Sequence, residues 1–144
     1  MFLRNFSKVP DDKLTWQATP TAKSALRIAA HTALYMGRFA SMINARSTPA
    51  VDDIEAWVAK NVAEENAITT REQVEQAFRQ GTEEVIAALD SLTPEDTERM
   101  IDSGQGWTMP MTFLMNLPGW HTAVHMGQID FLQTCWDDQE IYVG

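Results

Sequence analysis

The sequence has 144 residues, 44% of them hydrophobic, which is enough to build the core of one domain over residues 1–144. The formal net charge of −9 and the pI near 4.6 argue against a nucleic-acid partner, because phosphate contacts need clustered Lys and Arg side chains. A single cysteine, Cys135, excludes an internal disulfide framework, and the N-terminal residues have neither the apolar core of a secretion signal nor the length of a membrane span. These features predict a soluble cytoplasmic protein without a membrane partner.

The N-terminal half predicts two helices and a connecting piece. Apolar residues in segment 2–9 have helical spacing, and the prolines and polar residues that follow break the pattern. A long second helix is expected over residues 21–45. The acidic stretch after it predicts a short connecting helix, roughly residues 52–62, to which we assign no catalytic role.

Two capping signals organise the middle of the chain. Thr69 and Glu72 have the spacing of a capping box, which starts a long helix with core periodicity to about residue 91. Thr93 and Pro94 then open a helix that we expect to reach about residue 102. Residues 103–106 are the stretch that we expect to be most flexible.

The C-terminal part predicts a last long helix. Residues 107–117 are rich in Met and aromatic side chains, which favours core or a dimer surface over a cofactor site. Because Pro118 disrupts helical hydrogen bonding, the last helix either kinks or begins there; we expect helix on both sides with a bend, ending near Trp136. No alternating run predicts a strand. The fold expected is all-α, most simply an antiparallel four-helix bundle with short connecting helices.

Two histidines four residues apart lie on this last helix. His121 and His125 project from one face with Cβ atoms roughly 5–6 Å apart, a spacing that suits one transition-metal ion. The same stripe includes Val124, Gln128, Leu132, Cys135 and Trp136, whereas Asp130, Gln133 and Thr134 fall on the opposite side. This pattern predicts that the histidines point inward, and it favours Cys135 as a packed small hydrophobe rather than a nucleophile.

The remaining histidine, His31, lies on an inward stripe of the second helix. Its face mixes apolar and polar residues, namely Ser24, Arg27, Ile28, Leu34, Tyr35, Arg38 and Met42. If the two helices face each other, three imidazoles meet and leave a fourth tetrahedral position for water or substrate, as in catalytic zinc sites. Imidazole ligands suit zinc, nickel, copper and iron, and of these we expect zinc first and nickel second. The alternative is a set of core histidines bonded to backbone carbonyls and water.

Three segments carry a resemblance to a known family: Lys13-Leu-Thr-Trp16-Gln-Ala-Thr-Pro20, Ser24-Ala-Leu-Arg-Ile-Ala-Ala-His31, and His121 to Leu132 with its H-x-x-x-H-x-Gly-Gln pattern. Together they resemble the DinB/YfiT-like superfamily of small metal-binding helical proteins. The resemblance implies a metal triad of His31, His121 and His125. It also implies a homodimer, for which Trp57, Trp107, Trp120 and Trp136 are candidate surface residues.

Four further residues are candidates for the chemistry of the site. Gln128 is placed to orient a bound water or a ligand imidazole, or else closes a core hydrogen bond. Arg27 and Arg38 flank His31 and are candidates to hold an anionic substrate group, or else pair with nearby acidic residues. Tyr35 is one turn from His31 and is a candidate donor to a metal-bound oxyanion, with core packing as the alternative.

Three functions remain open on the sequence. The first is a metal-dependent enzyme acting on a small molecule. The resemblance implies either an S-transferase that uses a low-molecular-weight thiol or a hydrolase. The second is a stress-response protein that binds a metal or ligand without turnover, and the third is a helical dimer with core histidines.

Overall fold

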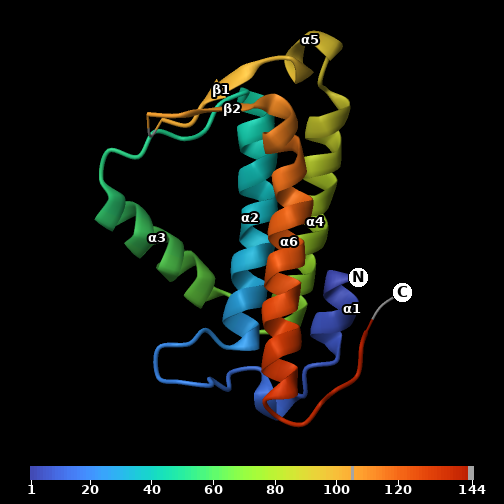
Figure 1. Ribbon diagram of the computed structural model, residues 1–144. Coiled ribbons are helices and arrows are strands. Elements are labelled where there is room, and N and C mark those ends of the chain that lie inside the picture. The colour runs from blue at the N-terminus through green and yellow to red at the C-terminus, as the bar shows by residue number, and fades with distance from the viewer. Residues whose placement is uncertain (105, 143–144) are drawn as a thin grey trace.

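The computed structural model describes residues 1–104 and 106–142 and is mostly helical. Its three long helices, α2 (Ala25–Ala45), α4 (Arg71–Asp90) and α6 (Met111–Thr134), lie side by side (Figure 1). The shorter elements are α1 (Phe2–Ser7), a 3-10 helix (Asp11–Lys13), α3 (Ile54–Ala67), α5 (Pro94–Thr97), β1 (Met100–Asp102) and β2 (Thr108–Pro110). The predicted long helices are therefore confirmed, with α2 beginning four residues later than expected.

The helix directions differ from a simple antiparallel arrangement. Helices α2 and α4 run in the same direction, while α6 runs against both (Figure 1). The parallel pair is possible because α3 carries the chain back along the molecule between them, leaning away from the other helices (Figure 1). Helix α1 packs beside α6.

Gly81 lets α2 and α4 approach closely. A Cβ atom at this position would lie 2.6 Å from the Cβ of Met36 and 2.9 Å from the backbone nitrogen of Gly37. No side chain fits at that separation, so the glycine sets the contact between the two helices.

Two hydrophobic clusters fill the interior along the long helices. The cluster near α1 contains Phe2, Phe6, Val9, Ala25, Leu26, Ile28, Ala29, Ala33, Val74, Ile129 and Leu132. The cluster near the hairpin contains Met36, Phe39, Ala40, Ile43, Val85, Ala88, Ile101, Met109, Met111 and Leu114. Helix α2 contributes to both clusters, so burial of its apolar side chains joins the two ends of the molecule.

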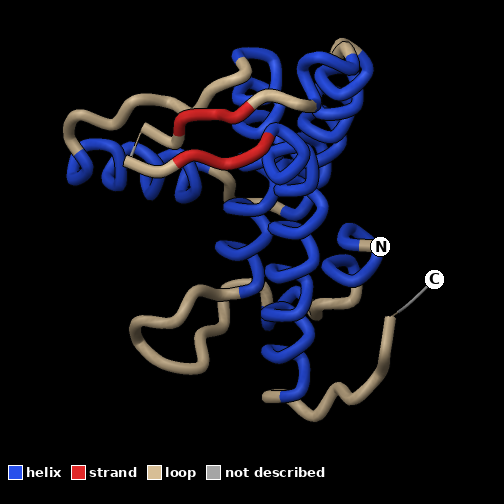
Figure 2. Tube along the Cα trace, turned by 45° about the horizontal axis from the view of Figure 1, so that its top comes forward, coloured by secondary structure: helices blue, strands red, loops and turns tan. Residues whose placement is uncertain are grey.

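A short antiparallel hairpin replaces the end of one predicted helix (Figure 2). Helix α5 ends at Thr97 rather than near residue 102, and Ile101 in β1 pairs with Met109 in β2. Both of these side chains are buried, which anchors the hairpin on the long helices. Three-residue strands are too short to show an alternating pattern in the sequence. Of the stretch expected to be flexible, Gln105 lies outside the described residues.

Two other predicted boundaries shift. The capping box that starts α4 uses Thr70 and Gln73, one residue beyond the predicted pair. The Gln73 side chain accepts a hydrogen bond from the Thr70 backbone N–H, as a glutamate does in the same motif. Helix α3 extends to Ala67, well past residue 62, with a cap at Asp53.

Helix α6 continues through Pro118, so helix on both sides of this proline is confirmed. Its buried stripe is rotated relative to the prediction: Gln133 is buried, whereas Val124 and Cys135 are exposed. Cys135 is not a packed core residue, because the helix ends at Thr134 and the extrapolated helical angle no longer applies. The two histidines consequently lie at the edge of the buried stripe.

The tryptophans divide into two groups. Trp107 and Trp120 are 49% and 61% exposed, whereas Trp57 and Trp136 are partly buried. The ring of Trp136 packs edge-on against Trp16, with centroids 5.5 Å apart.

None of the helices within the described residues combines the length and apolarity needed to cross a membrane.

Candidate metal centre

The three histidines converge between α2 and α6. The Nε2 atom of His121 lies 3.2 Å from that of His31 and 3.1 Å from that of His125. Three ring nitrogens, one from each residue, all lie within 4.8 Å of one another. Two nitrogens bound to one tetrahedral zinc ion at 2.0–2.1 Å lie roughly 3.3 Å apart, so the spacing fits a single ion.

The helices explain this convergence. His121 and His125 are one turn apart on α6, with ring centroids separated by 4.3 Å. The His31 ring reaches them from α2, with centroids 5.1 Å and 4.8 Å away. Close packing of α2 against α6 therefore brings together residues that are 90 positions apart.

Hydrogen bonds on the outer ring nitrogens define the tautomers of two histidines. His31 Nδ1 lies 2.6 Å from a carboxylate oxygen of Glu65, which can only accept, so His31 Nδ1 donates. His125 Nδ1 likewise lies 2.7 Å from the amide oxygen of Gln128. In both rings the unprotonated nitrogen is then Nε2, which faces the centre of the cluster. His121 Nδ1 is buried and has no hydrogen-bond partner among the described residues.

Glu65 is the residue that sequence reasoning missed. It lies on α3, is 5% exposed, and also accepts a bond of 2.8 Å from Lys23 Nζ. Burial acts to raise the Glu65 pKa, but the bonds from Lys23 and His31 outweigh it, so the pKa is lowered and the carboxylate is charged. No sequence signal separated it from the other acidic residues of this segment: only the structure shows that Asn61 and Glu65, four positions apart, are the buried residues of α3.

Burial favours the neutral form of two of the imidazoles, His31 and His121. Burial, followed by the neighbouring His125 and His31, lowers the pKa of His121 to about 3. Burial also lowers the pKa of His31, despite the bond to Glu65. Metal ligation requires unprotonated imidazole nitrogens, so these pKa shifts favour ion binding.

The donor set fits a divalent ion. Nε2 of His31 and Nε2 of His125 are unprotonated, and His121 Nε2 lies 3.2 Å and 3.1 Å from them, so the three nitrogens can share one cation when His121 carries its proton on Nδ1. Within residues 1–104 and 106–142, no cysteine or carboxylate joins the three histidines in the cluster. The described side chains therefore offer three candidate ligands.

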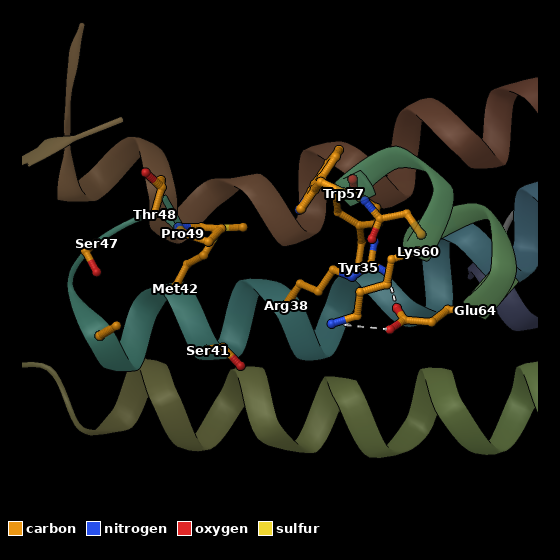
Figure 3. Close-up of a pocket in the computed structure, with 12 residues that line it drawn as sticks. Tyr35, Arg38, Ser41, Met42, Ser47, Thr48, Pro49, Trp57, Lys60 and Glu64 are labelled. Atoms are coloured by element: carbon orange, nitrogen blue, oxygen red, sulfur yellow. Dashed lines mark hydrogen bonds and ion pairs between the residues drawn. The ribbon is translucent and has the colours of Figure 1, made fainter. Parts of the chain in front are cut away.

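Tyr35 and Arg38 lie beside the triad. The Tyr35 ring is 4.4 Å from His31 and 4.9 Å from His121, measured between centroids. The Arg38 guanidinium carbon lies 4.6 Å from the Tyr35 centroid, and Arg38 Nη2 donates to Glu64 at 2.6 Å. Both residues line a cavity of about 470 Å³ between α2, α3 and the segment 47–49 (Figure 3).

The other two candidate residues, Arg27 and Gln128, form hydrogen bonds to other residues of the protein. Arg27 donates to the backbone carbonyls of Glu65 and Ile68, and so ties the end of α3 to α2. Gln128 contacts His125, as described above, and is exposed. Gln128 and Tyr35 thus contact histidines of the triad directly. Arg38 contacts Tyr35 on the side of the cavity, and Arg27 lies where the end of α3 meets α2.

The fold and the site together define a class: helical proteins in which two facing helices bring three histidines to one point. The chain belongs to the DinB superfamily, whose sequence profile matches residues 1–129. No curated protein has a matching sequence.

Two solved structures have similar folds. A DinB-like protein, YjoA, from Bacillus subtilis is 20% identical, with a TM-score of 0.67 over 99% of this chain and 87% of that one. A mycothiol-dependent maleylpyruvate isomerase is 13% identical, with a TM-score of 0.65 over 89% of this chain. This chain spans only 54% of the isomerase.

Proposed function

We propose that this protein is a metal-dependent enzyme that acts on a small molecule at the site formed by His31, His121 and His125. The observation that carries the proposal is the convergence of the three imidazoles, with Nε2 separations of 3.1 and 3.2 Å. Zinc or nickel is the proposed ion. We further propose a cytoplasmic location, a single domain, a homodimer, and a four-helix bundle in which α1 is the fourth helix.

The proposed reaction class is thiol-dependent transfer or hydrolysis. A divalent ion in such a site lowers the pKa of a bound water or holds a thiolate. Similarity to an isomerase named as mycothiol-dependent supports a low-molecular-weight thiol as the co-substrate. Three protein ligands would leave an ion able to take a water or a substrate atom as a further ligand, which either reaction would need.

Neighbouring side chains have defined roles in this proposal. Glu65 holds the proton on His31 Nδ1, and Gln128 does the same at His125, so both rings keep Nε2 available. Tyr35 has its ring against two of the histidines and is the proposed hydroxyl donor toward a substrate oxygen.

Elemental analysis of the tag-free protein tests the proposal. We expect about one zinc or nickel ion per chain in the wild type, and loss of the ion in His31→Ala, His121→Ala and His125→Ala with helical circular dichroism retained. Thr122→Ala is the matched control, because this α6 residue bonds to the carbonyl of Pro118 rather than to the histidines, and it should keep the ion.

Two results would contradict the assignment. Full occupancy in any single histidine variant would show that the triad is not the site. Absence of bound ion even after reloading with zinc and nickel would make the histidines core residues. With the ion established, turnover that needs an added thiol would identify a transferase, and turnover without it a hydrolase; no turnover would leave a metal-binding protein.

A further inference from the structure

The cavity next to the triad contains polar donors that nothing in the protein satisfies. Arg38 Nη1 and Asn61 Nδ2 are both buried, and neither has a hydrogen-bond partner within the described residues. Both side chains line the same cavity of about 470 Å³. Burial of a donor without a partner is unfavourable, so two such donors lining one cavity favour a ligand that accepts hydrogen bonds there.

The charge of the cavity favours an anion. Its charged lining residues are Arg38, Lys60 and Glu64, two cations and one anion, in a chain of net charge −9. The Arg38 guanidinium donates to Glu64 through Nη2, at 2.6 Å (Figure 3), whereas Nη1 has no partner among the described residues. A guanidinium donates in a fork that matches the two oxygens of a carboxylate.

The remaining walls suit a flat or apolar group. Tyr35 and Trp57 line the cavity together with Met42 and Pro49. The guanidinium stacked over the Tyr35 ring is held in place for a ligand beside that ring. Tyr35 also contacts His31 and His121, so it forms a wall shared by the cavity and the triad.

We propose that this cavity binds a small organic carboxylate, with Arg38 Nη1 and Asn61 Nδ2 as its donors and the aromatic side chains against its apolar part. The identification of this carboxylate as the substrate of the adjacent centre rests on the proposed function. The binding site itself does not, because none of its donors is a histidine of the triad.

Benzoate is a suitable probe, with benzamide as its neutral counterpart. In an amide-detected NMR titration of the metal-free full chain, benzoate should shift the side-chain signals of Asn61 and Arg38 and the indole signal of Trp57 in a saturable manner. Benzamide should bind at least tenfold more weakly, because it lacks the charge that Arg38 recognises.

Variants test the donors separately. Arg38→Met and Asn61→Leu should each weaken benzoate binding by about tenfold or more, while Arg79→Met, an exposed arginine of α4, should leave it unchanged. Glu64→Gln should strengthen binding, since it removes the carboxylate that competes for Arg38. Two substitutions at different helices guard against a variant that fails to fold, which circular dichroism would reveal.

The outcomes separate this proposal from the metal site. Benzoate shifts elsewhere in the protein, equal binding of benzamide, or unchanged affinity in both Arg38→Met and Asn61→Leu would overturn the carboxylate site. Binding at the cavity in a protein that takes up no metal would support the carboxylate site while contradicting the proposed enzyme.

Discussion

Glu65 connects the third helix to the metal centre through one side chain. Its two carboxylate oxygens accept from His31 Nδ1 at 2.6 Å and from Lys23 Nζ at 2.8 Å. The carboxylate fixes which nitrogen of His31 is free for an ion and makes that nitrogen more basic. The orientation of His31 therefore depends on α3 as well as on its own helix.

Replacement of Glu65 should weaken metal binding without removing a ligand. Glu65→Gln keeps the size of the side chain but removes the negative charge that stabilises His31, so we expect a loss of about 10- to 100-fold in zinc affinity. Competition with a chromophoric chelator measures this affinity. Glu64→Gln is the control, because Glu64 bonds to Arg38 and no histidine. Equal affinities in Glu65→Gln and wild type would show that the carboxylate does not support the site.

Sequence reasoning could find the three candidate ligands and Gln128, which bonds to His125, but not Glu65, which bonds to His31. His121 and His125 are one helical turn apart, so their shared face follows from the helix period alone. The bond between His31 and Glu65 joins residues 34 positions apart, and Glu65 belongs to α3, the helix that leans away from the others. No local pattern encodes such a contact.

At the scale of elements, the predicted helices were confirmed where the apolar periodicity of the sequence extends over several turns. Helices α4 and α6 show several turns of apolar residues and strong start or stop signals, and their positions matched within a few residues. Helix α5 has a start signal and no apolar turns to extend it, so the chain leaves the helix after four residues and enters β1. Burial of Ile101 and Met109 on the long helices overrode local propensity there.

The contact between α2 and α4 predicts opposite effects for two glycine substitutions. Gly81→Ala gains about 1 kcal/mol of helix propensity but forces a Cβ into Met36 and Gly37, an overpacking that costs about 1–3 kcal/mol. We expect a net loss of stability in urea unfolding. Gly119→Ala is the control: nothing lies within 4 Å of the added Cβ, so it should stabilise by up to about 1 kcal/mol. A stabilised Gly81→Ala protein would contradict the close approach of the two helices.

For the whole molecule, the triad brings together α2 and α6, which otherwise meet through packing and through the bond from Thr122 Oγ1 to Met36 Sδ. His31 is on α2, the helix that contributes to both hydrophobic clusters, and its partners are on α6. An ion bound there would cross-link the first long helix to the last. The unfolded chain has no assembled site, so the ion would bind the folded state. Self-association stays a prediction, with Trp107 and Trp120 as its exposed aromatic candidates.

This cross-link predicts metal-dependent thermal stability. A ligand that binds only the folded state at a hundredfold excess over its Kd stabilises by about 2.7 kcal/mol, which for a domain of this size corresponds to a rise in Tm of roughly 5–15 °C. Zinc should therefore raise the Tm of the metal-free wild type by this amount in differential scanning calorimetry, and a chelator should reverse it. His125→Ala should lose the effect. Cys135→Ser should keep it, because the exposed thiol lies outside the cluster. An equal rise in His125→Ala would place the stabilising ion elsewhere in the chain.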